Sequence, residues 1–428
     1  MSIAIVGMLD EREEALGIIR DCIAQRGHKP LLMDISVGTG AIVPSLQADV
    51  RCDELLELGR KSGEPVPGGK STVTSVMAQG LKAKILELQQ SGELQGIIAI
   101  TGMTGALISL TAMKALPFGV PKLLVSGATA QPAHATQFAD YFAVRDITVM
   151  NTVVDTVGMN ALVRTLAVNG ANAISGMVEG TRDLRYEGRP SIAITEFGFC
   201  EKGAHHIRAI LEKEYDLVSF HATGLGDKAI MDLLPQGIFK AFVDLVPGAF
   251  SEHLLGGNRG FVGPHRLDAA SALPLPYIFC PGGFDIISCG PMERRDRNDP
   301  LWTSRRLAER KLFVQDPPRV QARMNPEETE YVAAAAAERL NQYSVKARVK
   351  AVIPRKGFSS ISIEGGPLHD PAADRVFAAA FKEHLDREIE IIEVDSDINS
   401  PAFAEAVAGA LARAMTGETG KGGSSQHG

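Results

Sequence analysis

The chain has 428 residues, of which 45% are hydrophobic and 22% charged, and its formal net charge is −7. This length exceeds what one hydrophobic core usually supports, so we expect two domains. An acidic chain without a concentrated basic patch is a poor partner for nucleic acid. No apolar run reaches the roughly 18 residues of a membrane span, which argues against a membrane protein. The five cysteines show no Cys-x-x-Cys spacing, and this usage fits a reducing cytoplasmic compartment.

Short apolar runs alternate with longer helical patterns along the whole chain. Continuous apolar strands separated by helices are typical of a parallel sheet that is covered on both faces. The fold class we expect is therefore α/β, with two Rossmann-like, doubly wound parallel-sheet domains. Strands are expected over residues 3–7, 30–35, 96–101, 122–126, 139–144, 191–195, 217–221, 241–245, 277–280, 351–354 and 390–394. Helices are expected over 11–26, 71–91, 106–115, 153–177, 204–215, 229–234, 266–272, 327–343, 372–385 and 401–414.

A polar, glycine-bearing segment at 179–189 has no periodic pattern and is typical of a linker. It divides an N-terminal domain, residues 1–182, from a C-terminal domain, residues 188–415. Residues 416–428 are rich in Gly, Ser and Lys and are expected to form a disordered tail.

The strongest local signal is an apolar strand at 97–101 that runs through Gly102, Met103, Thr104 and Gly105 directly into a helix. Glycines let backbone N–H groups approach a phosphate, and a helix N-terminus supplies partial positive charge. A plain strand-to-helix turn is the alternative. Lys70, in Pro67-Gly-Gly-Lys-Ser-Thr72, is a second candidate for a phosphate contact or a solvated loop lysine.

In the second half, His221 ends a predicted strand and Asp285 follows another, each beside a glycine-rich turn. In open parallel sheets, ligands bind at the carboxyl ends of the strands, so both are candidate catalytic residues. A histidine bonded within the sheet and an aspartate that caps a turn are the alternatives.

The long loop at 354–370 is glycine-rich and polar, and loops of this length in compact domains are often functional. Arg355 is a candidate for binding an anionic group. Glu364 and His369 are candidates for acid–base chemistry or for holding a metal of unknown identity. Asp370 precedes Pro371 and is expected to cap the next helix.

Several stretches, taken in order and spacing, resemble a known family: the ATP-binding N-terminal region of the tomato mosaic virus resistance protein and its bacterial relatives. They include residues 102–106, 116–122, 153–160, 220–226, 266–270, 354–357, 370–374 and 398–403. The resemblance implies two Rossmann-like domains, a homodimer and ATP, with or without Mg²⁺, in the N-terminal domain. The chain departs from the family's pattern at Met103, Ala106 and Ser362, which favours a subfamily with a different ligand.

Three functions are compatible with these observations. The first is a nucleotide-binding protein with its ligand in a cleft between the domains. The second is a metabolic enzyme, a hydrolase or a C–C lyase, that acts without a nucleotide on a small carbonyl or carboxylate substrate. The third is a regulatory protein whose dimer surface is its function.

Overall fold

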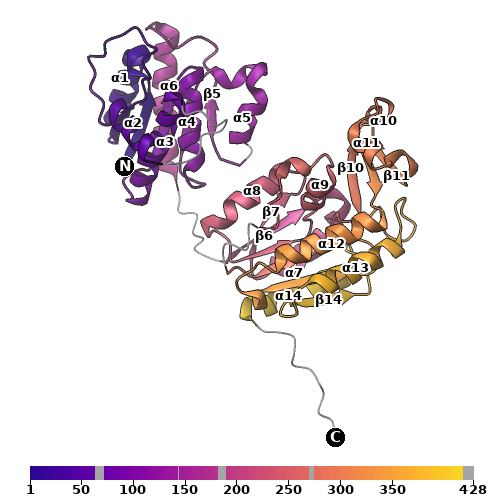
Figure 1. Ribbon diagram of the computed structural model, residues 1–428. Coiled ribbons are helices and arrows are strands. Elements are labelled where there is room, and N and C mark those ends of the chain that lie inside the picture. Colours follow the sequence, from indigo (N-terminus) through magenta and orange to yellow (C-terminus); the bar gives the residue numbers. More distant parts are fainter. Residues whose placement is uncertain (63–71, 143, 182–188, 269–273, 418–428) are drawn as a thin grey trace. The chain divides into compact units, whose positions relative to one another are not determined.

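The structure is a computed structural model that describes residues 1–62, 72–142, 144–181, 189–268 and 274–417. The chain forms two compact units, Met1–Leu184 and Arg185–Gly428 (Figure 1). Each unit is described by itself below. Among the described helices, none is both long and apolar enough to cross a membrane.

The N-terminal unit is built on a five-stranded parallel sheet in the order β2-β1-β3-β4-β5. Ile5 of β1 lies opposite Leu32 of β2 on one side and Ile98 of β3 on the other. The chain therefore reverses its direction of winding between β1 and β3. The strands are β1 (Ser2–Gly7), β2 (Lys29–Asp34), β3 (Gly96–Ile100), β4 (Lys122–Val125) and β5 (Thr148–Met150).

Helices cover both faces of this sheet, as the apolar strands predict. α1 (Leu9–Gln25) and α6 (Ala161–Gly180) pack together over one face. The other face is covered by α2 (Cys52–Lys61), α3 (Val73–Gln90), α4 (Met103–Ala115) and α5 (Ala135–Phe142). The expectation of a doubly wound α/β fold is confirmed in this unit.

Two expected elements of this unit are corrected, and one helix is new. Residues 139–144 were expected to form a strand, but residues up to Phe142 end helix α5, and the edge strand β5 is the short run Thr148–Met150. The helix expected over 153–177 begins only at Ala161, because the side chain of Asn160 caps the N–H groups of Leu162 and Val163. Helix α2 was not expected.

The C-terminal unit contains a six-stranded parallel sheet in the order β14-β13-β9-β8-β6-β7. Renumbered within the unit, its first five strands repeat the 2-1-3-4-5 order of the N-terminal sheet. The reversal of winding lies between β6 and β8. The strands are β6 (Ser191–Glu196), β7 (Asp216–His221), β8 (Ala241–Asp244), β9 (Tyr277–Phe279), β13 (Val349–Pro354) and β14 (Glu390–Val394).

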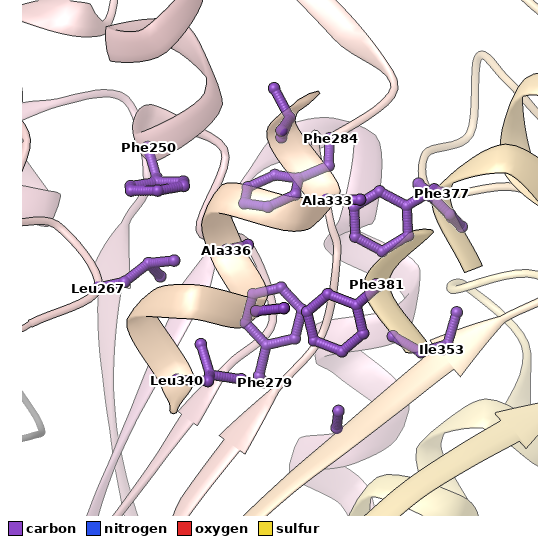
Figure 2. Packing of buried hydrophobic residues seen from close by; sticks show 14 of the residues in the cluster. Phe250, Leu267, Phe279, Phe284, Ala333, Ala336, Leu340, Ile353, Phe377 and Phe381 are labelled. Carbon is purple, nitrogen blue, oxygen red and sulfur yellow. The ribbon is translucent and has the colours of Figure 1, made fainter. Parts of the chain in front are cut away.

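One face of this sheet packs on α7 (Glu201–Leu211) and α14 (Pro401–Thr416). The other carries α8 (Leu225–Leu233), α9 (Ala249–Leu255), α12 (Pro326–Leu340) and α13 (Pro371–His384). Figure 2 shows its aromatic core, in which Phe279 stacks on Phe381 at 5.2 Å and Phe377 stacks on Phe381 at 5.6 Å between ring centroids. Doubly wound packing is thus confirmed in this unit as well.

A three-stranded antiparallel sheet in the order β10-β12-β11 was not expected. It consists of β10 (Ile286–Gly290), β11 (Leu312–Asp316) and β12 (Arg319–Arg323), with the short helices α10 (Glu293–Asp296) and α11 (Pro300–Ser304) between the first two strands. The helix expected over 266–272 is not seen in its described part, because residues 266–268 form a turn.

Candidate functional site

A pocket of about 630 Å³ lies in the N-terminal unit. It lies at the carboxyl ends of β3, β4 and β5, next to the start of α1 after β1. Because the winding reverses between β1 and β3, this is the place where doubly wound sheets bind ligands. The lining residues are Arg12, Thr101, Gly102, Met103, Gly127, Ala128, Ala130, Gln131, Pro132, Asn151, Thr152, Val153, Val154, Asp155 and Thr156.

Arg12 supplies a buried positive charge at this pocket. It lies in the first turns of α1, where its backbone departs from helical geometry (φ −133°, ψ 29°), and it is only 5% exposed. Its Nε donates to Oγ1 of Thr156 at 2.7 Å, its Nη1 pairs with Glu11, and its Nη2 lies 3.5 Å from a carboxylate oxygen of Asp155. The Nη2 contact is long and its partner is largely exposed, so Nη2 is the nitrogen best placed to serve a ligand.

The N-terminus of α4 lies beside Arg12. Gly102 occupies the N-cap position and provides no side-chain cap, so no N-cap side chain accepts from the first N–H groups of the helix, at Met103, Thr104 and Gly105. A Cβ on Gly105 would lie 2.8 Å from the side chain of Thr101, so glycine is needed there for close packing. The Oγ1 of Thr101, a pocket residue, is buried without a hydrogen-bond partner. Helix N–H donors without a side-chain cap, together with a guanidinium, favour an anion.

The rim of the pocket is a strained turn. Val153 has φ 63°, which β-branched residues rarely adopt, and the N–H of Val154 donates to the carbonyl of Thr152 at 2.6 Å. This i→i+2 bond defines a γ-turn. The side chain of Val153 is 87% exposed, so no packing of that side chain accounts for the strain. Asp155, which follows the turn, brings an exposed carboxylate to the same rim.

A magnesium ion bound to a nucleotide usually takes one or two carboxylates together with phosphate oxygens. Asp155 fits this requirement, because it lines the pocket and its side chain is 78% exposed. The described residues contain no group of three or more His, Cys, Asp or Glu side chains arranged to hold a metal by themselves. Lys70 lies outside the described residues, and its proposed phosphate contact stays a prediction.

In the C-terminal unit, His221 ends β7 and lines a separate pocket of about 270 Å³. Its Nδ1 lies 2.9 Å from Oγ1 of Thr223, and its side chain is exposed. The predicted position of this histidine at a strand end is thus found, while its catalytic role stays a prediction.

Asp285 is buried, and one of its carboxylate oxygens accepts from Oγ of Ser359 at 2.6 Å. The same oxygen lies 3.8 Å from Nη1 of Arg323, whose Nη2 pairs with Asp374 at 2.5 Å. Burial raises the pKa of Asp374 to about 6, although the attraction of Arg323 opposes the shift. Asp285 is therefore part of a buried polar cluster that contacts the 354–370 loop, and it does not line either described pocket.

The other candidates lie on the 354–370 loop. The side chains of Arg355 and Glu364 are exposed, and His369 is half-buried with its carbonyl accepting from Nζ of Lys311 at 2.8 Å. Asp370 accepts from the N–H of Ala373 and caps α13, as expected. The structure thus does not place Asp285, Glu364 and His369 around one of the described pockets with His221, and their catalytic roles stay predictions.

A second buried charge network lies at the end of β8. Arg266 is 1% exposed and pairs with Asp227 at 2.6 Å and with Asp244 at 2.8 Å. Asp244 also accepts from Thr195 at 2.7 Å and from Tyr277 at 2.8 Å. Both carboxylate oxygens of Asp244 accept hydrogen bonds within the network. We therefore assign the network a role in stabilising the fold and not in binding a ligand.

Two buried arginines at the pockets were not expected from the sequence: Arg12, and Arg259, which lines the same pocket as His221. Arg12 stands in the acidic run Asp10-Glu-Arg-Glu-Glu14 and has the appearance of a surface residue. Arg259 lies in a glycine-rich stretch without a periodic pattern. The available signal for Arg12 was its position just after the first strand, which in a 2-1-3-4-5 sheet borders the reversal point.

Both units match models of a known protein family. Residues 1–183 match the model described as "Uncharacterised protein family (UPF0261) N-terminal domain", and residues 189–415 match that of its C-terminal domain. The chain is 30% identical to a UPF0261 protein of Clostridium tetani over 96% of this chain and 98% of that protein. It is also 30% identical to one from Mesorhizobium japonicum, over 96% of this chain and 98% of that protein.

A plant relative is more distant. The ToMV resistance protein Tm-1(GCR237) of Solanum lycopersicum is 25% identical over 78% of this chain and 43% of that protein. Among solved structures, the glycosyltransferase VinC in complex with DTDP aligns over 96% of this chain and 95% of that chain, with 10% identity and a TM-score of only 0.19. The resemblance stated from the sequence is confirmed, and the chain belongs to the UPF0261 family.

Proposed function

We propose that the N-terminal unit binds a nucleotide, with ATP and Mg²⁺ as the first ligand to test, in the pocket between Arg12 and the start of α4. The observation that carries the proposal is the buried guanidinium of Arg12 beside a helix N-terminus that lacks a side-chain cap. Both features attract phosphate oxygens. The family resemblance also implies ATP in this domain.

The size of the pocket supports a ligand larger than a phosphate ion. Small-molecule sites usually measure about 300–1,000 Å³, and this pocket, at about 630 Å³, lies in that range. In the proposed complex, the N–H groups of Met103 and Thr104 donate to phosphate oxygens. Nη2 of Arg12 gives up its long contact to Asp155, and Asp155 takes the magnesium ion instead.

Calorimetry of the full chain with ATP, with and without Mg²⁺, tests the proposal. Arg12→Met should weaken ATP binding at least 30-fold, whereas Arg20→Met, on the same helix, should leave it unchanged. Asp155→Asn should abolish only the dependence on Mg²⁺. The proposal fails if ATP and ADP give no heat with the folded wild-type chain, or if Arg12→Met binds ATP as the wild type does.

We also propose that the chain forms a homodimer, as the resemblance implies, and that it lies in the cytoplasm, which agrees with its five free cysteines. Light scattering of the purified chain measures the first, and fractionation of cells measures the second. A monomer at micromolar concentration would remove the homodimer from the proposal without affecting the nucleotide site.

A further inference from the structure

The smaller pocket, in the C-terminal unit, has no part in the proposed nucleotide site. Its volume is about 270 Å³, and it lies where the doubly wound sheet meets the antiparallel sheet. The loops after β6 and β7 contribute one wall, with Phe197, Phe199 and His221. Strand β12 contributes the facing wall, with Val320 and Gln321.

Arg259 is the charged anchor of this pocket and is 6% exposed. Its Nη2 pairs with Glu252 at 2.8 Å, its Nη1 donates to the carbonyl of Ala222 at 3.4 Å, and its guanidinium lies 4.9 Å from the ring centroid of Phe197. Glu252 is held in turn by the N–H of Ser288 at 2.8 Å. A guanidinium has five N–H donors, so both terminal nitrogens keep a second hydrogen for a ligand.

Gln321 provides a second buried donor. It is 4% exposed, and its Oε1 accepts from Oγ of Ser288 at 3.0 Å. Because the amide oxygen of Gln321 accepts this bond, its NH₂ group, with two N–H donors, can bind a ligand in the pocket. His221 adds Nε2, because its Nδ1 is engaged with Thr223.

The charges of the pocket limit the kind of anion it suits. Arg259 is balanced by Glu252, and Arg319, which also lines the pocket, is paired with Asp316. The site therefore offers several hydrogen-bond donors but little net positive charge, which suits one negative charge better than the several of a nucleotide. Phe197, Phe199 and Val320 add an apolar surface for the rest of the ligand.

The volume also limits the ligand. Ligand sites usually measure about 300–1,000 Å³, so this pocket of about 270 Å³ suits a small ligand. We propose that the pocket binds a small organic monocarboxylate, with its carboxylate on Arg259 and Gln321 and a flat or branched apolar body on Phe197 and Phe199. This inference is independent of the nucleotide site in the other unit.

Titration of the full chain with benzoate and isobutyrate, followed by ligand-observed NMR, tests the proposal. At least one of the two should bind, and neutral benzamide and inorganic phosphate should bind at least tenfold more weakly. Gln321→Met and His221→Ala should each weaken carboxylate binding at least fivefold. His205→Ala, an exposed histidine on α7, should leave it unchanged.

Arg259→Met would leave Glu252 buried without its partner, so the two milder variants carry the test. Arg12→Met should retain carboxylate binding while it loses ATP, which separates failure of one site from failure of the other. The proposal is overturned if neither carboxylate binds the wild type. It is equally overturned if benzamide or phosphate binds as tightly, or if Gln321→Met and His221→Ala bind like the wild type.

Discussion

Arg12 and Gly102 approach each other closely where β1 and β3 end: a Cβ added to Gly102 would lie 3.0 Å from Nη2 of Arg12. The two residues are 90 positions apart in the chain, and the reversal of winding between their strands brings them together. Because Gly102 has no side chain, the guanidinium of Arg12 can lie beside the N-terminus of α4.

Gly102→Ala should weaken ATP binding about tenfold, which corresponds to about 1.4 kcal/mol, because the new methyl group displaces Nη2 of Arg12. Its φ of −83° suits alanine, so the thermal unfolding midpoint should change little. Gly176→Ala, on α6 with nothing within 4 Å of the added atom, is the control and should bind normally. Calorimetry with ATP measures both, and equal affinities in the two variants would count against the role of Arg12.

Val153→Gly should leave the free energy of unfolding unchanged or raise it, because glycine adopts φ 63° without strain. Val157→Gly, at a neighbouring exposed position without positive φ, should instead lower the free energy of unfolding by about 0.4–1 kcal/mol, because glycine adds conformational freedom to the unfolded chain. Urea unfolding of the two variants makes the comparison. A loss of stability at residue 153 as large as that at 157 would mean that the turn is not strained.

The pH dependence of stability should show the raised pKa of Asp374. Burial makes this carboxyl easier to protonate in the folded chain, at about 6, than at the ordinary value of 3.8, so protonation favours the folded state. As pH rises from about 4 through 6, this contribution is lost, on the order of 3 kcal/mol. The neighbouring charges are Arg323, Asp285 and Asp370.

The measurement is urea unfolding between pH 4 and 7 for the wild type and for Asp374→Asn, which cannot ionise. The stability of the wild type relative to Asp374→Asn should fall over this range. Asp395→Asn, an exposed aspartate paired with Lys356, serves as the control and should not alter the profile. Parallel profiles for the wild type and Asp374→Asn would show that Asp374 has an ordinary pKa.

Arg266→Met should destabilise the C-terminal unit by about 3–5 kcal/mol, because it leaves Asp227 and Asp244 buried without their cation. Lys61→Met removes an exposed i,i+4 ion pair with Glu57 and should not shift the urea midpoint. A midpoint for Arg266→Met close to that of the wild type would show that the two carboxylates are protonated or hydrated there.

The sequence predicted the parallel strands well because both faces of each sheet are covered, which makes runs such as residues 97–100 continuously apolar. The prediction failed where a strand is not continuously apolar. Strand β5 has only three residues, and the apolar run before it belongs to the amphipathic helix α5. Strand β12 buries Gln321 and Arg323 beside its apolar residues, so it lacks the alternation that predicts an antiparallel strand.

The candidate sites were predicted less completely than the fold. Glycine-rich strand ends identified Gly102 and His221, because close backbone approach and strand-end position are visible in sequence. Arg12 and Arg259 are defined by burial and by long-range partners such as Thr156 and Ala222, which only the folded chain brings together. The expected site in a cleft between the domains stays a prediction, and the pockets at Arg12 and Arg259 each lie within one unit.

A crystal structure of the full chain with ATP and Mg²⁺ tests the central claim most directly. We predict that the phosphate groups lie within hydrogen-bonding distance of the N–H groups of Met103 and Thr104 and of Nη2 of Arg12, with the metal on Asp155. ATP bound elsewhere on the chain, with the pocket between Arg12 and α4 occupied by water alone, would contradict the claim.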